Sequence, residues 1–365
     1  MGSNSFGTIF RITTWGESHG KGIGVVIDGC PAGIPLSEDD INQELFKRQG
    51  GKTPYTTPRL EKDHAEIFSG VFEGKTTGAP ISIIIFNHNV DSSAYEPIKD
   101  LLRPGHSNYP YLKKYGIFDY RGGGRSSGRE TACRVAAGAV AKKILTHFGI
   151  SSLAYIKEIG GIQIEAMDPV EIGEIRKKTE ASPIFCPDAL GEKKIIQAIL
   201  QIKEEKDSLG GIVECITTPL PIGLGDPIYE KLEANLAKAI LSIPATKGFE
   251  IGSGFEAAKL KGSTHNDLFI ADDQGQISTK TNYAGGTLGG ITIGMPLIFR
   301  VAFKPTSSIE QKQETVDLTG NSQTIELSNN SRHDPCIAIR AVPVVEAMAN
   351  LVLVDCILRN RLSKI

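Results

Sequence analysis

The sequence lacks several features that mark large classes of proteins. Its 40 basic and 42 acidic residues nearly cancel, so no excess of one sign favours nucleic acid or an anionic membrane. No apolar stretch approaches the ~20 residues of a membrane span. The first residues, MGSNSFGTIF, lack the basic and apolar regions of a secretory signal. We therefore expect a cytoplasmic protein that binds neither nucleic acid nor a membrane.

Cysteine is sparse and its spacing is uninformative. The six cysteines are widely scattered and form no CxxC pair, so the sequence offers no zinc site and we expect no bound metal. Buried reduced thiols are the best interpretation for most of them. Glycine, by contrast, is abundant at 40 residues, which indicates tight turns or close approaches of the backbone to a ligand.

The pattern of apolar residues predicts a mixed α/β fold. Residues 22–29 read as a buried strand, and a helix follows that is capped by Ser37 with Asp40 in the capping-box position. Residues 130–148 form the clearest helix, which Gly149 ends. We expect further strands at 65–72, 81–87, 153–163, 212–218 and within 285–305, and further helices at 193–205, 227–241 (with Asp226 at the cap and Pro227 in the first turn) and 344–358.

Length alone allows one large domain or two ordinary ones. The sequence contains no internal repeat and no low-complexity linker. We therefore expect one α/β unit (α+β mixed) over residues 1–365, with βαβ and ββα elements intermixed.

Two glycine-rich turns contain histidine. In TTWGESHGKG, Gly16 and Gly20 flank Ser18 and His19, and a neutral histidine can give or take a proton near pH 7. Taken alone, that stretch is better explained as an ordinary turn with a partly buried histidine. In LLRPGHSNYP, Arg103 and His106 bracket a Pro-Gly turn. This pairing suits an anionic substrate that also needs protonating, although an ordinary surface turn is an equal alternative.

The segment DYRGGGRSSGRETACRVAAGAV is the most informative. Three glycines precede Arg125, Ser126 and Ser127, and Arg129 stands just before the strong helix. Free N–H groups at a helix start, hydroxyls and guanidinium groups together make an anion site. The segment is neither a Walker A loop nor a GxGxxG turn, and a flexible surface loop is the less favoured alternative.

Two later clusters complete the set. FKPTSSI places Lys304 beside the hydroxyls of residues 306–308, which suits a second phosphate or a polar ring edge, or else a simple strand-end turn. NSRHDPCIAIR places Arg332, His333 and Asp334 before a proline. Asp334 could accept a proton or only pair with an arginine. Jointly, the clusters favour two bound phosphorylated molecules with acid–base groups between them.

These motifs, in this order, resemble the chorismate synthase family over nearly the whole chain. The resemblance rests on GESHG, RPGH, DYRGGGRSSGRET, HND, AGGTLGGI, KPTSSI and RHDPC…RAVPVVEAM. It implies a single β-α-β sandwich assembled as a homotetramer. It also implies conversion of 5-enolpyruvylshikimate 3-phosphate to chorismate by 1,4-anti elimination of phosphate, with reduced FMN and no net redox change, as the last step of the shikimate pathway.

The resemblance also implies roles for individual residues. His19 matches a proton donor to the leaving phosphate, His106 a histidine near flavin N1, and Asp334 a carboxylate near flavin N5. The matching substrate contacts are Ser18, Arg48, Arg103, Arg129 and Arg332. The matching flavin contacts are Arg125, Ser126, Ser127, Ala245, Gly289, Lys304, Pro305, Thr306, Ser307, Ser308 and Arg332.

Two positions depart from the family pattern. Pro54 stands where many relatives carry arginine, and Lys52 could supply that charge; Pro244 stands where asparagine is common. NADPH is expected only if the protein reduces its own flavin, and no dinucleotide fingerprint is visible, so reduction by another enzyme is favoured. A non-catalytic flavin or phosphosugar module is the other alternative, but it would not need two histidines and Asp334 together.

Overall fold

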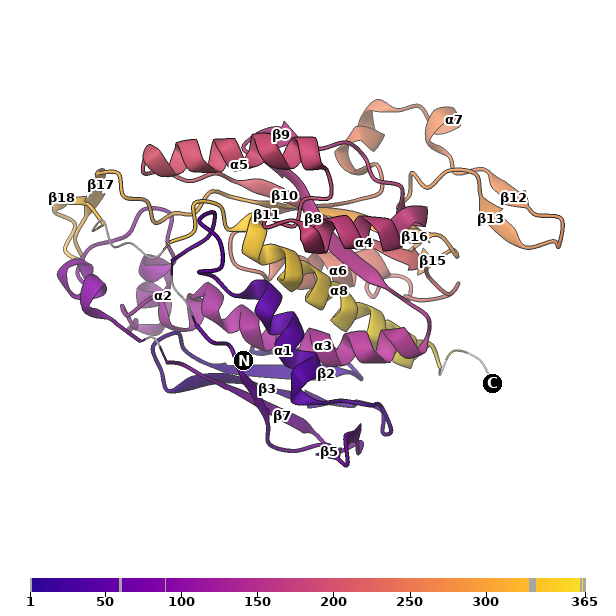
Figure 1. The fold of residues 1–365 in the computed structure, drawn as a ribbon, viewed down its shortest axis with the longest axis horizontal. Helices are drawn as coiled ribbons and strands as arrows, with labels where there is room; N and C mark the ends of the chain where they lie inside the picture. The colour runs from indigo at the N-terminus through magenta and orange to yellow at the C-terminus, as the bar shows by residue number, and fades with distance from the viewer. Residues whose placement is uncertain (1, 59–60, 89, 328–332, 362, 364–365) are drawn as a thin grey trace.

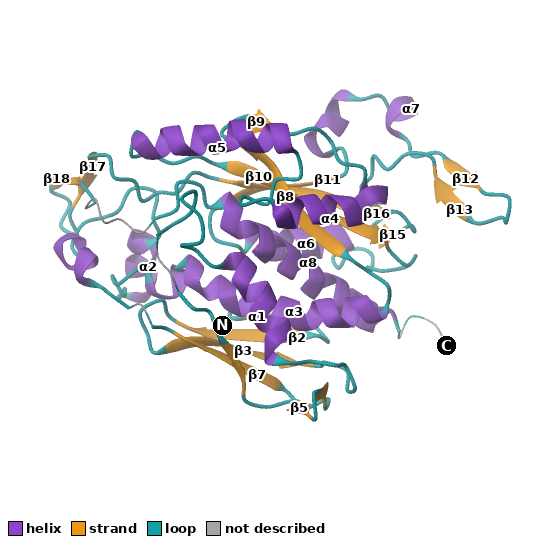
Figure 2. Cartoon of the chain, viewed as in Figure 1, coloured by secondary structure: helices purple, strands orange, loops and turns teal. Residues whose placement is uncertain are grey.

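Two antiparallel sheets enclose a layer of helices in the computed structural model, which describes residues 2–58, 61–88, 90–327, 333–361 and 363 (Figures 1 and 2). The first sheet has the order β1-β2-β3-β7-β4 and comprises β1 (Ser5–Phe6), β2 (Arg11–Gly16), β3 (Gly22–Asp28), β7 (Ile81–Phe86) and β4 (Ala65–Ile67). The second has the order β11-β16-β10-β8-β9 and comprises β11 (Thr246–Ile251), β16 (Pro296–Phe303), β10 (Gly211–Pro219), β8 (Ser152–Ile159) and β9 (Ile162–Gln163).

The helices form two groups. Between the sheets lie α1 (Glu38–Arg48), α3 (Thr131–His147), α6 (Leu232–Leu241) and α8 (Ala338–Asn360). Here α3 packs against α8 and the first sheet, while α8 packs against β8 and β10. Outside the second sheet lie α4 (Ile172–Ala181) and α5 (Ala189–Glu204), which contact β8, β10 and β9. The result is the expected β-α-β sandwich with additional helices on one side.

The burial pattern of the strands explains these layers. β2 and β7 alternate buried and less buried residues, because only one face of the first sheet is covered by helices. β8 is buried along almost its whole length, because helices cover both faces of the second sheet. Close packing of the two central helices requires Gly138, since a Cβ there would lie 2.4 Å from the Cβ of Ala347.

The last helix is a core helix that is apolar enough to cross a membrane by length and composition. α8 has 23 residues, and its most apolar window is completely buried between the sheets. Its two buried carboxylates are both paired: Glu346 with Lys142 at 2.9 Å, and Asp355 with the backbone N–H groups of residues 8–10. The expectation that no apolar stretch approaches the length of a membrane span is therefore wrong for this segment.

The remaining elements are short. They are β5 (Val71–Phe72), β6 (Lys75–Thr76), β12 (Phe269–Ala271), β13 (Ile277–Thr279), β14 (Thr287–Leu288), β15 (Ile291–Thr292), β17 (Gln313–Val316), β18 (Ser322–Ile325), α2 (Asn108–Tyr115), α7 (Gly262–His265), and the 3₁₀ turns η1 (Ser93–Ile98), η2 (Gly124–Ser126), η3 (Gly128–Glu130), η4 (Pro169–Glu171) and η5 (Gly254–Lys259). The β12–β13 hairpin and α7 project from the body of the molecule (Figure 1).

Several predictions from the sequence are confirmed. α1 starts at the predicted capping box, in which the Ser37 side chain accepts from the Asp40 N–H and the Asp40 side chain accepts from the Ser37 N–H. α3 covers nearly all of its predicted range, and all six cysteines are buried and unbonded to one another.

Other predictions are wrong in detail. α6 starts at Leu232, five residues late, because the Asp226 carboxylate pairs with Arg359 of α8 at 2.7 Å instead of capping the helix. Residues 153–163 turn at Gly160–Gly161 into the β8–β9 hairpin. Every strand pair in the described ranges is antiparallel, so the intermixed βαβ elements do not form parallel crossovers.

Candidate active site

A cavity of about 910 Å³ opens at the N-terminal ends of α3 and α8 and the C-terminal end of α1. Its lining brings together most residues that the motifs predicted: Arg48, Arg103, His106, Arg125, Ser126, Ser127, Arg129, Ala245, Lys304, Pro305, Thr306, Ser307, Ser308 and Asp334. Helix N-termini carry partial positive charge and free N–H groups, so this end of the helical layer favours anions.

His106 lies in the cavity wall beside a cation. Arg103 Nη2 lies 2.8 Å from His106 Nε2, and the Asn108 backbone N–H donates to Nδ1 at 3.2 Å. Burial, and then the charge of Arg103, lower the pKa of His106 from 6.5 to about 3. The imidazole is therefore neutral at pH 7, because a protonated ring would face a guanidinium group that can only donate.

Asp334 is fixed through both carboxylate oxygens. The Thr57 backbone N–H donates to Oδ1 at 2.9 Å, and Arg340 Nη1 pairs with Oδ2 at 2.9 Å. Arg340 itself lines the cavity and also donates to the Arg48 carbonyl at 3.1 Å. The carboxylate that the sequence suggested as a proton acceptor is thus buried, oriented and in the same cavity as His106.

A strip of hydroxyls and cations runs along another wall. Ser107 donates to Ser126 at 2.8 Å, and Lys304 Nζ donates to the Gly105 carbonyl at 2.7 Å. Thr306 lines the same wall, and its buried Oγ1 has no hydrogen-bond partner within the described ranges. Such a buried hydroxyl gains by meeting a polar ligand atom.

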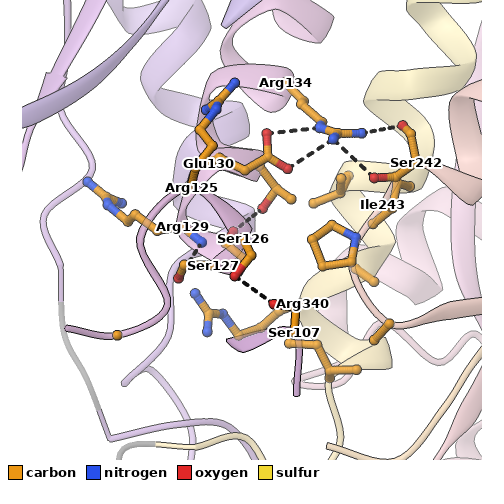
Figure 3. Close-up of a pocket in the computed structure, with 18 of the residues that line it drawn as sticks. Ser107, Arg125, Ser126, Ser127, Arg129, Glu130, Arg134, Ser242, Ile243 and Arg340 are labelled. Atoms are coloured by element: carbon orange, nitrogen blue, oxygen red, sulfur yellow. Dashed lines mark hydrogen bonds and ion pairs between the residues drawn. The ribbon is translucent and has the colours of Figure 1, made fainter. Parts of the chain in front are cut away.

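Arg134 is a site residue that the sequence reasoning missed. It pairs with Glu130 at 3.0 Å and donates to the Ser242 side chain at 2.6 Å and the Ser242 carbonyl at 3.1 Å (Figure 3). These bonds tie the 242–245 corner, including Ala245, to α3. The four-residue spacing of Glu130 and Arg134 on a helix was the available indication.

Ser18 and His19 lie behind the cavity wall and do not line the cavity. Both are buried, and the Ser18 hydroxyl lies 2.9 Å from His19 Nδ1. Gly122 and Tyr95 separate them from the cavity: both line it, and the Tyr95 ring meets the His19 ring edge-on at 5.5 Å between centroids. The structure therefore places His19 next to the site rather than in it.

We expect Gly122→Ala to displace His19. A Cβ at Gly122 would lie 2.3 Å from His19 Cε1 and 2.8 Å from Ser18 Oγ, and φ is +61°. Overpacking of this kind costs about 1–3 kcal/mol, and we expect at least a roughly tenfold loss of turnover if His19 acts on the substrate. Steady-state assay and thermal unfolding measure the two effects.

The matched control is Gly116→Ala. Gly116 has a similarly positive φ of +75°, but its added Cβ would meet no atom within 4 Å. This variant carries the backbone strain without the collision, so turnover should stay near that of the wild type. Equal turnover of the two alanine variants would show that the His19 position has no influence on the reaction.

Besides Ser18 and His19, three further positions named from the sequence are not placed in the cavity. Gly289 lies at the β14–β15 turn, outside the lining, and its role stays a prediction. Arg332 falls outside the described residues. Lys52, the suggested substitute for an arginine at Pro54, lies 3.8 Å above the Phe46 ring and is not part of the lining. Within the described ranges no group of three or more His, Cys, Asp or Glu side chains is arranged to hold a metal.

The fold and the site together define a class of protein. A mixed α/β sandwich presents a cavity lined with arginine, hydroxyls and oriented acid–base groups. This arrangement is that of an enzyme acting on a phosphorylated, acidic small molecule.

Comparison with known proteins identifies the family. Residues 10–358 match the chorismate synthase family model. Chorismate synthase from Protochlamydia amoebophila (strain UWE25) is 58% identical over 370 residues, covering 100% of both chains, and that from Methanosarcina mazei is 50% identical over 360 residues, covering 99% of this chain and 97% of the relative. A crystal structure of chorismate synthase superposes with a TM-score of 0.78 at 34% identity, covering 97% of this chain and 92% of that one.

The chain belongs to the chorismate synthase family. Members of this family are carbon–oxygen lyases, and they act at the last step of the shikimate pathway. The fold class and the family predicted from the sequence are thus confirmed.

Proposed function

We propose that this cavity converts 5-enolpyruvylshikimate 3-phosphate to chorismate and phosphate by a 1,4-anti elimination. The C3–O bond to phosphate breaks, the C6–H bond breaks, and a new double bond forms with no net redox change. The observation that carries the proposal is the convergence of cations, His106 and Asp334 on one cavity. A binding module would need the cations but not two oriented acid–base groups.

The cations suit a substrate with two carboxylates and a phosphate. Arg48, Arg103 and Arg129 all line the cavity. Arg129 has a buried Nη2 without a hydrogen-bond partner in the described part of the chain. An anionic oxygen that reached this atom would remove the cost of an unpaired buried donor and stabilise the leaving phosphate.

The acid–base groups take separate roles in this proposal. His19, with Ser18 beside it, gives a proton to the departing phosphate. Because Gly122 lies between His19 and the cavity, this step requires the Gly122 segment to move aside when the substrate binds. His106 is neutral and accepts a hydrogen bond at one ring nitrogen, and negative charge that develops next to it raises its low pKa, so it can take up a proton at that point. Asp334 is held as a fixed acceptor for the C6 hydrogen.

The cavity also fits the flavin that the family resemblance implies. A cavity of about 910 Å³ is large enough for a drug-sized cofactor together with substrate. Residues 125–127, Ala245 and residues 304–308 would hold FMN, and the unpartnered Thr306 hydroxyl offers it a hydrogen bond. When bound and reduced, FMN supplies electron density transiently to the allylic system and recovers it. We propose that another enzyme reduces it, because no NADPH fingerprint is present in the sequence.

We further propose that the chain acts as one domain, residues 1–365, in a cytoplasmic homotetramer. One continuous core joins both sheets and the central helices, which supports a single domain. Residues 254–279, which include η5, α7 and the projecting β12–β13 hairpin, expose the large apolar side chains of Phe255, Leu268, Phe269 and Ile277, and exposed apolar side chains of this kind indicate a protein interface. Sedimentation equilibrium should give four times the mass of the chain; a monomer would refute the assembly.

The function is tested by mixing the protein with photoreduced FMN and 5-enolpyruvylshikimate 3-phosphate without oxygen. We expect release of phosphate together with the absorbance of chorismate. Flavin binding without turnover would instead identify a binding module. Turnover that depends on added NADPH, with oxidised FMN and no other reductant, would identify an intrinsic reductase.

A further inference from the structure

A buried carboxylate joins two arginines of the cavity. Asp63 comes from the segment before β4, and its side chain is almost completely buried. Its Oδ2 pairs with Arg48 Nη1 at 3.1 Å, and its Oδ1 pairs with Arg129 Nη1. All three residues line the cavity. We propose that Asp63 is a positioning residue for the reaction, which orients Arg129 toward the substrate; this inference rests on the proposed function.

Arg48 holds the Asp63 carboxylate in one position. Its Nε donates to Thr131 Oγ1 at 2.8 Å and its Nη2 to the Gly128 carbonyl at 2.7 Å, so each of its nitrogens has a protein acceptor. These bonds fasten the end of α1 to the start of α3. Arg48 therefore anchors the carboxylate, and its own guanidinium has less freedom than Arg129 to turn toward a ligand.

Arg129 is held from two directions and keeps one nitrogen unpaired. Asp63 takes its Nη1, and Asn87 Oδ1 accepts from its Nε at 2.9 Å. Its Nη2 is buried without a partner in the described ranges. Asn87 also donates to the carbonyls of Glu17 and Gly20, so the same side chain ties Arg129 to the loop of His19. The bonds of Arg129 to Asp63 and Asn87 fix the plane of its guanidinium group, and this plane sets the direction of the unpaired Nη2.

The charge of Asp63 matters as well as its position. Two guanidinium groups beside one carboxylate leave one net positive charge for the substrate phosphate. Without the carboxylate the two cations would repel each other, and Arg129 would turn away from Arg48. A displacement of about 1 Å at a reacting group can cost roughly 100-fold in rate.

A double-mutant cycle tests whether Asp63 acts through Arg129. We expect Asp63→Asn to lower kcat/KM at least tenfold in the wild-type background. In the Arg129→Ala background the same change should lower kcat/KM less than about threefold, because the arginine that Asp63 orients is no longer present. Titration calorimetry with 5-enolpyruvylshikimate 3-phosphate in the absence of flavin gives the same cycle for binding alone. Full additivity in both measurements would overturn the proposal.

Glu214→Gln is the matched control for loss of a buried ion pair. Glu214 is buried, pairs with Arg300 at 3.3 Å and lies outside the cavity. Its loss should lower the melting temperature and leave kcat/KM of the folded protein unchanged. A general stability effect would instead lower kcat/KM alike in the Asp63 and Glu214 variants, which would also contradict the proposal.

A second variant serves if Asp63→Asn does not fold. Asp63→Glu keeps the charge but moves the carboxylate by one methylene, so it should fold and show the same loss, again only when Arg129 is present. An unchanged kcat/KM in Asp63→Glu would refute positioning. The proposed function has a separate check, because failure of the wild type to release phosphate would refute it whatever the cycle gives.

Discussion

Replacing His106 with alanine should lower kcat by roughly 10²–10⁴-fold, the usual contribution of a positioned acid–base group. His106 is the imidazole that lines the cavity beside Arg103 and is neutral at pH 7. Negative charge that develops beside the ring raises this low pKa, so the imidazole can then accept a proton, which a methyl group cannot do. Rapid-mixing measurement of chorismate formation with pre-reduced FMN gives kcat without the reduction step.

Two variants separate the chemistry of His106 from its bulk. His106→Asn keeps a neutral hydrogen-bonding side chain but has no basic nitrogen that could take up a proton during the reaction, so it should be nearly as slow as the alanine variant. His147→Ala, at the far end of α3 and outside the cavity, should retain wild-type turnover. A His106→Asn variant with normal kcat would show that the residue only orients its neighbours.

The depressed pKa of His106 also predicts a pH effect on stability. The folded-state pKa of about 3 lies below the ordinary 6.5, so the unfolded chain takes up a proton in this range and the folded protein does not. His106 therefore lowers stability as the pH falls from 6.5 toward 3. The loss of melting temperature between about pH 7 and about pH 5 should be smaller in His106→Ala than in the wild type; an equal loss would contradict the shifted pKa.

Asp334→Asn should lower kcat by a similar 10²–10⁴-fold. The amide has the shape of the carboxylate and can still accept from the Thr57 N–H, but it cannot accept the C6 hydrogen as a proton. KM should change less than kcat, because the arginines bind the substrate in this proposal and Asp334 acts only on the C6 hydrogen. A deuterium label at C6 should give a larger isotope effect in this variant, since C6–H cleavage becomes slower.

The outcome for Asp334 can be distinguished from loss of its ion pair. Arg340→Lys keeps a cation near Asp334 Oδ2 but loses the bond to the Arg48 carbonyl, so it should reduce kcat far less than Asp334→Asn. If both variants lose activity equally, Asp334 serves to hold Arg340 and another group receives the C6 hydrogen.

Much of the molecule could be predicted from the sequence, because local patterns have local causes. The capping box at Ser37 set the start of α1, and the small, apolar residues of 131–147 set a helix that packs closely. Motifs with several charged or hydroxyl residues at glycine turns indicated the ligand chemistry. Their joint order, more than any one of them, indicated the family, which the comparisons confirm.

Local patterns failed where the partner is distant in sequence. Asp226 looked like a helix cap, but Arg359, 133 residues later, takes its carboxylate. Asp63 belongs to no motif, and Arg134 lies in a quoted segment but was given no role; their contacts with residues 129 and 242 exist only in the folded chain. The family resemblance implied a catalytic role for His19, yet Gly122 separates it from the cavity, a distinction that depends on packing across 103 residues.

By itself the sequence determined the kinds of side chain available: guanidinium groups, hydroxyls, imidazoles and a carboxylate at turns beside helix starts. Tertiary structure decided which of them share one cavity, which nitrogen of Arg129 is left without a partner, and that His19 is recessed. The physical reason is that burial, charge compensation and hydrogen bonding depend on distances between segments, and those distances are set only when two sheets close over the same helices.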